Sequence, residues 1–291
     1  MYKLLLCTRY LTTRYIAWAS VVSVMLGVAT LIVVNSVMMG FHDKMRERLH
    51  GALADVVLES TTPNGLTDPK GVMQKIRQVA GDRIVAMAPS VQVFGMLHYQ
   101  VQGRGVHQAR PVVIVGVDPR ERDAVGSFSE HLQNPLNRKE PSFQLHDDAR
   151  ARREKNADPR FADAPTPAGA VIGYQIGTLR DPATDADQVV VAPGQEIVLT
   201  TATAGQPKPV DSRFVVTDYF RCDMSEYDGQ YVFVPIERLQ RIRQMGDAVT
   251  AVLIKLRSYD DAPQVVAALR QAFPAVYFSV ETWEDKQGAL L

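Results

Sequence analysis

The chain has 291 residues, and 46% of them are hydrophobic, which is enough to bury a substantial core. Its 32 basic and 32 acidic residues balance, so the net charge excludes a global attraction to nucleic acid or to acidic ligands. It has two cysteines, Cys7 and Cys222, which excludes a disulfide-rich fold.

The N-terminal residues carry the strongest signal in the sequence. Residues 1–15 combine several leucines with three basic residues, which predicts a short interfacial helix. Residues 16–41 contain no Asp, Glu, Lys or Arg. As a helix they would measure roughly 39 Å, more than the ~30 Å of a bilayer's hydrocarbon core. The run is longer than the apolar part of a signal peptide and no cleavage pattern follows it, so we predict a retained transmembrane helix.

Basic residues flank this predicted span on both sides. Lys3, Arg9 and Arg14 precede it, and three more follow it closely, so the positive-inside comparison is nearly a tie. A large folded domain can be translocated regardless of such charges. We therefore predict a protein of the cytoplasmic (inner) membrane with a cytoplasmic N-terminus and an extracytoplasmic main domain. Cys7 and Cys222 then lie on opposite sides of the membrane and cannot pair.

Small residues recur at four-residue spacing in the span and include Ser23 and Gly27. Such a ridge lets another membrane helix approach closely, although small residues are also common in membrane helices in general. Asn35 is a polar amide within the span, and it is predicted to face protein or a cavity because a buried amide in lipid needs a partner.

Three large apolar residues, Met38, Met39 and Phe41, mark the outer end of the span. Methionine side chains adapt to varied apolar partners, so these residues are candidates for contact with a lipid-modified substrate. The alternative is that they pack against a neighbouring helix. Beyond them, apolar residues continue at four-residue spacing, which predicts a helical stalk over residues 42–54.

The residues beyond the stalk alternate between strand and helix patterns. A β-α-β-β unit comes first, with an Asp-Pro helix start and a glycine stop, and a β-α-β unit comes last. The predicted elements are strands at 55–60, 84–100, 111–117, 249–256 and 276–280, helices at 68–80 and 260–272, and a hairpin turn at 102–105. Together, residues 55–118 and 248–282 are predicted to form one sheet-and-helix subdomain.

Residues 119–247 are then an inserted, mostly β subdomain. It contains a proline-rich polar stretch at 127–167, predicted as a solvated loop. The arginine-rich run at 150–155 is interleaved with acidic residues, which argues against a nucleic-acid patch. The remaining predicted elements are strands at 196–201, 213–219 and 230–235 and a helix at 236–244.

No catalytic constellation is present in the sequence. The six histidines have no metal-ligand spacing, and no Walker A motif occurs, so ATP hydrolysis by this chain is not predicted. Asp223, Glu226 and Asp228 lie close together but match no calcium loop, so they are interpreted as exposed turn acids. We predict no catalytic residue, no bound cofactor and no metal.

Several segments, in this order, resemble one family of membrane proteins. The first ends in Val-Met-Met-Gly-Phe, and the others contain short glycine-bounded or aromatic strands. The segments are 20–41, 169–177, 194–199, 214–220, 226–228 and 231–235, with the late Trp283. They resemble ABC transporter permeases of the lipoprotein-releasing (Lol), MacB and FtsX type, over nearly the whole chain.

The resemblance implies a membrane-anchored α+β protein. It has one N-terminal transmembrane helix with a stalk, then a MacB-like extracytoplasmic domain of two mixed α/β subdomains, the first of them porter-like. It also implies a cytoplasmic ABC ATPase as partner, a second permease copy or paralogue, and contact with membrane lipids. Residues 283–291 would begin a second membrane helix, so we expect the natural chain to continue.

For the Lol members, the resemblance implies extraction of lipoproteins and their transfer to a periplasmic chaperone. A hook loop that recruits the chaperone would correspond to residues 203–211, with Pro207 and Pro209. This loop is short and lacks an apolar tip. The polar insertion is also longer than the family pattern.

Three functions stay open on the sequence. The first is a transporter subunit that couples ATP hydrolysis to extraction or export of a lipoprotein or amphipathic substrate. The second is an FtsX-like subunit that transmits conformational work to a periplasmic hydrolase. The third is an anchored extracytoplasmic sensor domain.

Overall fold

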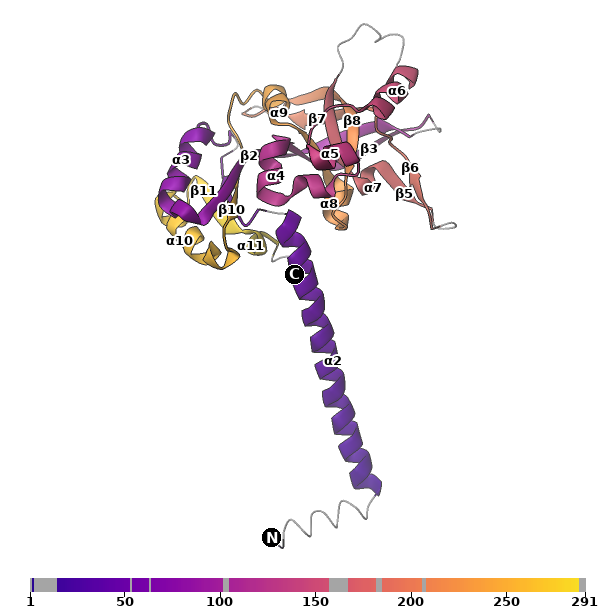
Figure 1. The fold of residues 1–291 in the computed structure, drawn as a ribbon, viewed down its shortest axis with the longest axis vertical. Helices are drawn as coiled ribbons and strands as arrows, with labels where there is room; N and C mark the ends of the chain where they lie inside the picture. The colour runs from indigo at the N-terminus through magenta and orange to yellow at the C-terminus, as the bar shows by residue number, and fades with distance from the viewer. Residues whose placement is uncertain are drawn as a thin grey trace. The chain divides into compact units, whose positions relative to one another are not determined.

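The computed structural model describes residues 2, 15–52, 54–62, 64–101, 105–156, 167–181, 185–205 and 208–287. The chain forms two compact units, Met1–Leu49 and His50–Leu291. The predicted interfacial helix at 1–15 lies almost entirely outside the described residues. The predicted span and stalk are one continuous helix, α2, which covers the 38 residues Tyr15–Ala52 (Figure 1).

The second unit is built around a sheet whose described part has nine strands, in the order β11-β1-β10-β2-β3-β9-β4-β8-β7. Most neighbours are antiparallel, whereas β3–β9 and β4–β8 are parallel. The strands are β1 (Val56–Ser60), β2 (Ile84–Gln100), β3 (His107–Val117), β4 (Ala168–Gly173), β7 (Glu196–Ala202), β8 (Pro209–Phe220), β9 (Tyr231–Pro235), β10 (Ala251–Leu256) and β11 (Phe278–Thr282). A separate hairpin consists of β5 (Thr178–Arg180) and β6 (Asp187–Val189).

The 17-residue strand β2 joins two parts of this sheet. Its first half pairs with β10, and its second half pairs with β3 on one side and β7 on the other. Because β7 also pairs with β8, the strands β2-β3-β9-β4-β8-β7 close on themselves as a small barrel. Strand β3 therefore pairs with β2, which precedes residue 118 in the sequence, and with β9, which follows it. The sheet is continuous across the predicted subdomain boundary at residue 118.

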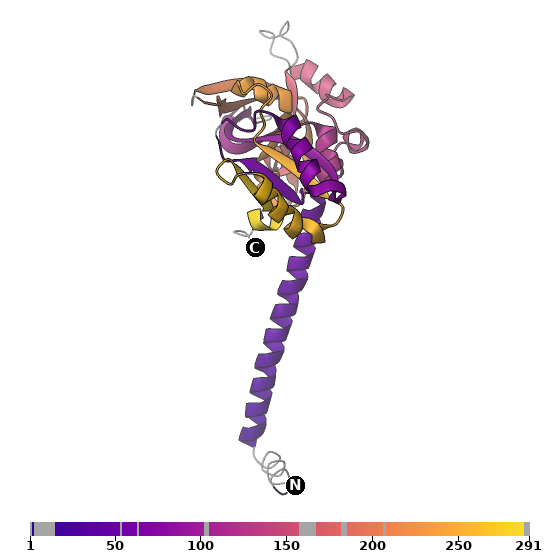
Figure 2. The ribbon, with the colours of Figure 1, turned by 90° about the vertical axis from the view of Figure 1, so that its left-hand side faces the viewer.

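Two helices cover one face of β11, β1, β10 and β2. They are α3 (Pro69–Ala80) and α10 (Ala262–Ala272), and Figure 2 views the molecule from their side. Helix α3 starts where predicted, because the Asp68 side chain accepts a hydrogen bond from the Gly71 N–H at 3.0 Å. It stops at Gly81, whose φ of 60° favours glycine. The predicted strands and helices at 55–100 and 249–280 are thus confirmed, with boundaries shifted by a few residues.

The expectation of a solvated loop at 127–167 is wrong for the residues that the structure describes. Helix α4 (Pro119–Gly126) leads into this segment, which contains a 3₁₀ turn at Phe128–His131 and the helices α5 (Pro135–Lys139) and α6 (Asp147–Asn156). Phe128, Leu132 and Asn137 are fully buried. Polar composition misled the prediction, because single apolar residues at turns are enough to dock such a segment on the barrel. Residues 157–166 lie outside the described residues.

The first and last strands of the domain, β1 and β11, are neighbours in the sheet. Strands β1 and β11 pair over five residues, and the backbone oxygen of Asp55 accepts a hydrogen bond from the Trp283 N–H at 3.2 Å. The buried Asp55 carboxylate accepts hydrogen bonds from Lys255 Nζ at 3.1 Å and from the Leu256 N–H at 2.8 Å. Trp283 opens the short helix α11 (Trp283–Gln287) and is only 2% exposed, so the domain continues beyond residue 282.

Candidate functional site

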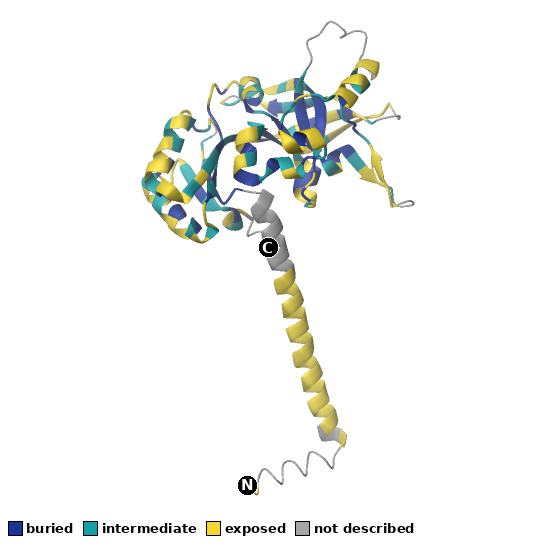
Figure 3. Cartoon of the chain, in the orientation of Figure 1, coloured by how far each residue is buried: buried dark blue, intermediate teal, exposed yellow. Residues whose placement is uncertain are grey.

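The first candidate site is the apolar part of α2. Trp18–Gly40 has the length and composition to cross a membrane, and none of its residues is buried (Figure 3). A core helix of a soluble protein with this composition would be mostly buried against its own domain. Thr30, a polar residue in this segment, donates its hydroxyl to the Leu26 carbonyl oxygen at 2.8 Å, so the helix itself satisfies this group.

The structure places the predicted span residues on two parts of this helix. Asn35, Met38 and Met39 are spaced i, i+3 and i+4, so they share one face, and both methionines are exposed. Ser23 and Gly27 lie one turn apart toward the N-terminal end, and space around Gly27 is open. Phe41 is helical, but its side chain lies outside the described part of the chain.

The predicted hook position is a short connection between β7 and β8. Pro209 is the first residue of β8 and pairs with Ala202, while the Thr203 N–H donates to the Lys208 carbonyl oxygen at 3.1 Å. The loop itself therefore covers only residues 203–208. Pro207 lies outside the described residues.

A second candidate site is a cavity of about 110 Å³ on the face of the sheet opposite α3 and α10. Its walls come from β1, β10, β2, β3 and β9, from the end of β8, and from α4, α11 and α8 (Ser225–Gln230). The lining residues are Ala54, Val57, Glu59, Ser90, Gln92, Val115, Arg122, Phe220, Cys222, Met224, Tyr227, Tyr231, Phe233, Ala251, Leu253, Trp283 and Lys286.

The cavity exists because the side chains of this face change size along the sheet. On one side the buried cluster consists of small residues, including Ala54, Ala88 and Ala251. On the other side the buried cluster includes large aromatic residues, and the Phe128 and Phe233 rings meet edge to face at 5.0 Å. The small side chains do not fill the space beside the larger aromatic side chains, so a cavity remains between the two clusters.

Among the described residues, three charged side chains line this cavity. Glu59 on β1 forms an ion pair with Lys286 on α11, and both are about one-third exposed. Arg122 on α4 is buried, and burial lowers the pKa of its guanidinium to about 10, although neighbouring tyrosines and Asp123 oppose this shift. Burial also raises the pKa of Tyr231, which keeps its phenol neutral.

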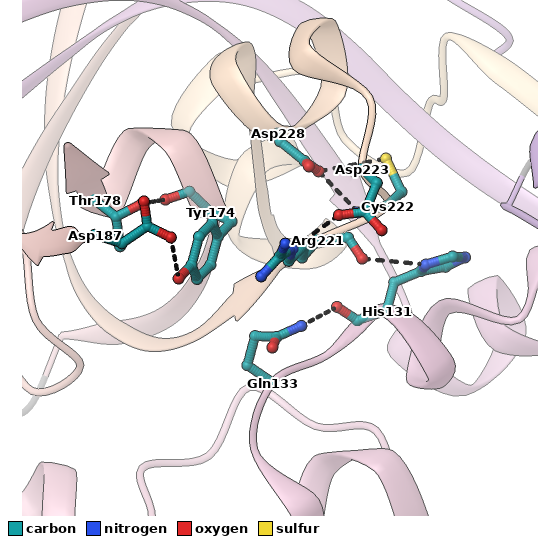
Figure 4. Close-up of polar contacts among 9 residues, drawn as sticks. All are labelled: His131, Gln133, Tyr174, Thr178, Asp187, Arg221, Cys222, Asp223 and Asp228. Atoms are coloured by element: carbon teal, nitrogen blue, oxygen red, sulfur yellow. Dashed lines mark hydrogen bonds and ion pairs between the residues drawn. The ribbon is translucent and has the colours of Figure 1, made fainter. Parts of the chain in front are cut away.

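Cys222, which lines the cavity, forms a buried polar pair with Asp228, and Figure 4 shows their contact. Asp228 Oδ1 accepts hydrogen bonds from the Cys222 N–H at 2.8 Å and from its Sγ at 3.3 Å. Asp228 is only 2% exposed, so its interpretation as an exposed turn acid is wrong, whereas Asp223 and Glu226 are exposed. The acids do not converge, and no cluster of metal-ligating side chains occurs among the described residues.

Figure 4 also shows a more exposed polar cluster, which consists of Arg221, Asp223, Tyr174 and Asp187. The Arg221 guanidinium lies 4.8 Å from the centre of the Tyr174 ring and donates to Asp223 at 2.9 Å. The Tyr174 hydroxyl donates to Asp187 on β6 at 3.1 Å. Partial burial, and then the hydrogen bond to Asp187, raise the pKa of Tyr174. These contacts tie the β5–β6 hairpin to the end of β8 and bring together no reactive group.

The comparisons with known proteins match this architecture. The model of the MacB-like periplasmic core domain matches residues 17–272. The chain belongs to this family. The MacB-like chain is also 24% identical over 290 residues to the lipoprotein-releasing system transmembrane protein LolC of Xylella fastidiosa. This alignment covers 95% of the chain but only 57% of LolC, so the chain spans little more than half the length of this curated relative.

Two solved structures are also similar to the MacB-like chain. The periplasmic region of MacB from Actinobacillus actinomycetemcomitans is 10% identical, with a TM-score of 0.39, over 85% of the chain and 97% of that structure. The extracellular domain of the noncanonic ABC-type transporter YknZ from Gram-positive bacteria is 12% identical, with a TM-score of 0.36, over 80% and 94%. The family and the fold class indicated by the sequence resemblance are confirmed: an apolar N-terminal helix followed by a MacB-like α/β domain.

Sequence reasoning missed most of the cavity. Arg122 stands in a polar run, and nothing in its neighbours along the chain signals burial. Trp283 was noted for the resemblance, and a lone tryptophan beside a strand is a usable signal of packing.

Proposed function

We propose that the chain is the N-terminal part of an ABC transporter permease subunit that acts on a lipoprotein or another amphipathic molecule in the outer leaflet of the cytoplasmic membrane. The observation that carries this proposal is the uncharged Trp18–Gly40 segment, none of whose residues is buried, in a chain of the MacB-like family. Only residues 53–55 separate the end of α2 from β1 along the chain. A displacement of the helix would therefore be transmitted to the start of β1. A separate cytoplasmic ATPase supplies the energy, and a second permease copy or paralogue completes the translocation path.

The proposed topology places the N-terminus in the cytoplasm and the domain outside. We expect protease added to right-side-out spheroplasts to digest the domain while a tag on Met1 survives. The tag should become accessible only after the membrane is permeabilised. Protection of the domain in intact spheroplasts would contradict this topology.

Substrate entry is proposed at the face that carries Asn35, Met38 and Met39. A photo-reactive residue at position 38 or 39 should crosslink to a lipoprotein, and the yield should change with ATP when the ATPase is present. Val37 is the matched control, because it is equally exposed but lies on a different face of the helix. Crosslinks only to another permease helix, unaffected by ATP, would make this face a packing surface and contradict substrate entry.

A second candidate is an FtsX-like subunit that moves a periplasmic enzyme without carrying cargo. The pairing of β1 with β11 and the Glu59–Lys286 ion pair favour it. These contacts connect the first and last elements of the domain, so a displacement of one would move the other. ATP-independent contacts at positions 38 and 39, together with ATP-dependent binding of a hydrolase, would favour this candidate. Transfer to a chaperone through residues 203–208 is testable by the same crosslinking in the presence of a periplasmic extract.

A further inference from the structure

The cavity between the two buried clusters has mostly apolar walls and a few polar groups. Most of its surface comes from aliphatic and aromatic side chains, with Phe220, Phe233 and Trp283 among the buried rings. Gln92 and Lys286, which are exposed, mark the side on which it meets solvent. Ligand sites commonly combine such apolar walls with a few placed polar groups.

The charge of these walls is positive. The described lining residues carry one acidic side chain, Glu59, and two basic ones, Lys286 and Arg122, and Glu59 forms its ion pair with Lys286. Arg122 is 7% exposed, and burial lowers the pKa of its guanidinium to about 10. An anion placed beside a buried guanidinium gains a charge-assisted hydrogen bond.

We propose that this cavity binds the carboxylate end of a single-chain fatty acid, with the carboxylate at Arg122 and the first methylenes against the aromatic rings of the wall. A cavity of about 110 Å³ is smaller than one of roughly 150 Å³ that holds benzene, so it accommodates only a few methylenes. The rest of the acyl chain leaves the cavity on the side of Gln92 and Lys286. This proposal is independent of the transport function, and failure of either leaves the other standing.

The chain offers a direct reporter for this binding. It has two tryptophans, Trp18 in the apolar helix and Trp283 in the cavity wall. In a Trp18→Phe variant of this chain in phosphatidylcholine vesicles, all tryptophan fluorescence comes from Trp283. A stearic acid with a nitroxide at carbon 5 should quench this fluorescence more than one with the nitroxide at carbon 16, because carbon 5 lies nearer the bound carboxylate.

Arg122→Met is the decisive variant, since it keeps the apolar stem and removes the charge. It should weaken the quenching by carbon-5 nitroxide about tenfold in apparent affinity, as expected for a lost charge-assisted hydrogen bond. Arg120→Met, on the same helix but exposed and paired with Glu140, should leave the quenching unchanged. Ala251→Leu, which fills the cavity with Arg122 intact, should also abolish the difference between the two probes.

Competition keeps the test independent of any variant. Decanoate should displace the carbon-5 probe, whereas the uncharged decanol should not, and added phosphatidylglycerol tells whether a lipid phosphate competes as well as a carboxylate. Displacement by the phospholipid but not by decanoate would overturn the fatty-acid assignment. Equal quenching in the Trp18→Phe protein with and without the Arg122→Met change, or equal displacement by decanoate and decanol, would show that the probes report only the bilayer and would overturn the proposal.

Discussion

Three buried aspartates hold the domain together at separate points. Asp55 joins the start of β1 to the end of β10, Asp228 joins the end of β8 to α8, and Asp218 joins β8 to the insertion. Each carboxylate accepts hydrogen bonds from backbone N–H groups, and this offsets part of the cost of burying a charge. Charge pairing at the surface is weaker by comparison, because solvent screens pairs such as Arg180–Asp185.

Cys222 should react slowly with alkylating reagents. Burial, and then the nearby Asp228 charge, raise the pKa of its thiol to about 12 from an ordinary value of 9.0. At pH 8 the thiolate fraction is then about a thousandfold lower than for an exposed cysteine. Iodoacetamide labelling of a Cys7→Ser protein, followed by mass spectrometry, should show this difference between the folded and the urea-unfolded chain.

Asp228→Asn is the matched variant for this measurement. It removes the charge but keeps an oxygen for the Cys222 N–H, so labelling should become faster without loss of the fold. Native labelling within tenfold of the unfolded rate in the unsubstituted protein would contradict a strongly raised pKa.

Asp218 should give the domain a pH-dependent stability of predictable sign. Burial raises its pKa, although hydrogen bonds from Asn137 and from backbone N–H groups of Tyr219 and Asn134 oppose the shift. Just above the ordinary carboxyl pKa of about 4, the folded domain keeps a proton that the unfolded chain has lost. The free energy of unfolding of the native domain, relative to Asp218→Asn, should therefore fall as the pH rises above about 4. Urea titrations measure it, and a difference that grows with pH would contradict the raised pKa.

Local signals predicted these residues unevenly. Asp68, Pro69 and Gly81 mark the two ends of α3 through contacts within a few residues of each, so the sequence alone locates them. The partners of Asp218 in the insertion, Asn134 and Asn137, lie 84 and 81 residues away along the chain, and no local pattern reveals them. The same limit explains why Arg122 was not predicted as a wall of the cavity.

At the scale of elements, the strands were predictable and their closure was not. Alternating or continuous apolar runs located β2, β7, β8 and β10, since burial on one or both faces sets that pattern. Pairing of β2 with β7 depends on the twist and bending of a 17-residue strand. The helices of the insertion were missed for a different reason, because their mostly polar sequences resemble those of solvated loops.

Because Gly169 on β4 has no side chain, the insertion residue Phe143 can pack closely against this strand. A Cβ at this position would overlap the Phe143 carbonyl oxygen and lie 2.7 Å from Thr217 Cγ2. Gly169→Ala should lower the free energy of unfolding by about 1–3 kcal/mol, because the backbone must shift to relieve the overlap. Trypsin should then cleave faster at Arg150 in helix α6.

Gly229→Ala is the control for this substitution. The nearest atom to a Cβ there is Gln175 Oε1 at 3.5 Å, which is an ordinary contact, and Gly229 lies in a helix. This variant should stay within about 0.5 kcal/mol of the native protein. Equal stability of the two alanine variants would mean that the insertion is not docked on β4.

At the scale of the whole molecule, the chain consists of the apolar unit Met1–Leu49 and the folded unit His50–Leu291. The sequence shows the same contrast, because residues 16–41 are uncharged and apolar, whereas the residues beyond the stalk alternate between strand and helix patterns. The C-terminal limit of the domain was harder to predict. Sequence placed the limit at residue 282, whereas the structure buries Trp283 against the domain, with its ring 6.0 Å from that of Tyr259.

The folded unit should therefore be stable alone only when it includes α11. A fragment of residues 51–287 should give mixed α/β circular dichroism and one cooperative melt, because both β-α-β units and the β1–β11 pairing are complete. A fragment of residues 51–282 lacks the buried Trp283 and should lose about 3–5 kcal/mol, a large share of the ~5–15 kcal/mol that stabilises a domain. Calorimetry and dye binding distinguish the two fragments.

Lys286→Ala within the longer fragment controls for the ion pair to Glu59. Both side chains are about one-third exposed, so this variant should lose no more than about 1 kcal/mol. If the 51–287 fragment bound dye without a cooperative melt, the domain would depend on residues outside these limits. If the two fragments were equally stable, Trp283 would contribute little to the core, and the cavity beside it would have a weaker wall than the structure indicates.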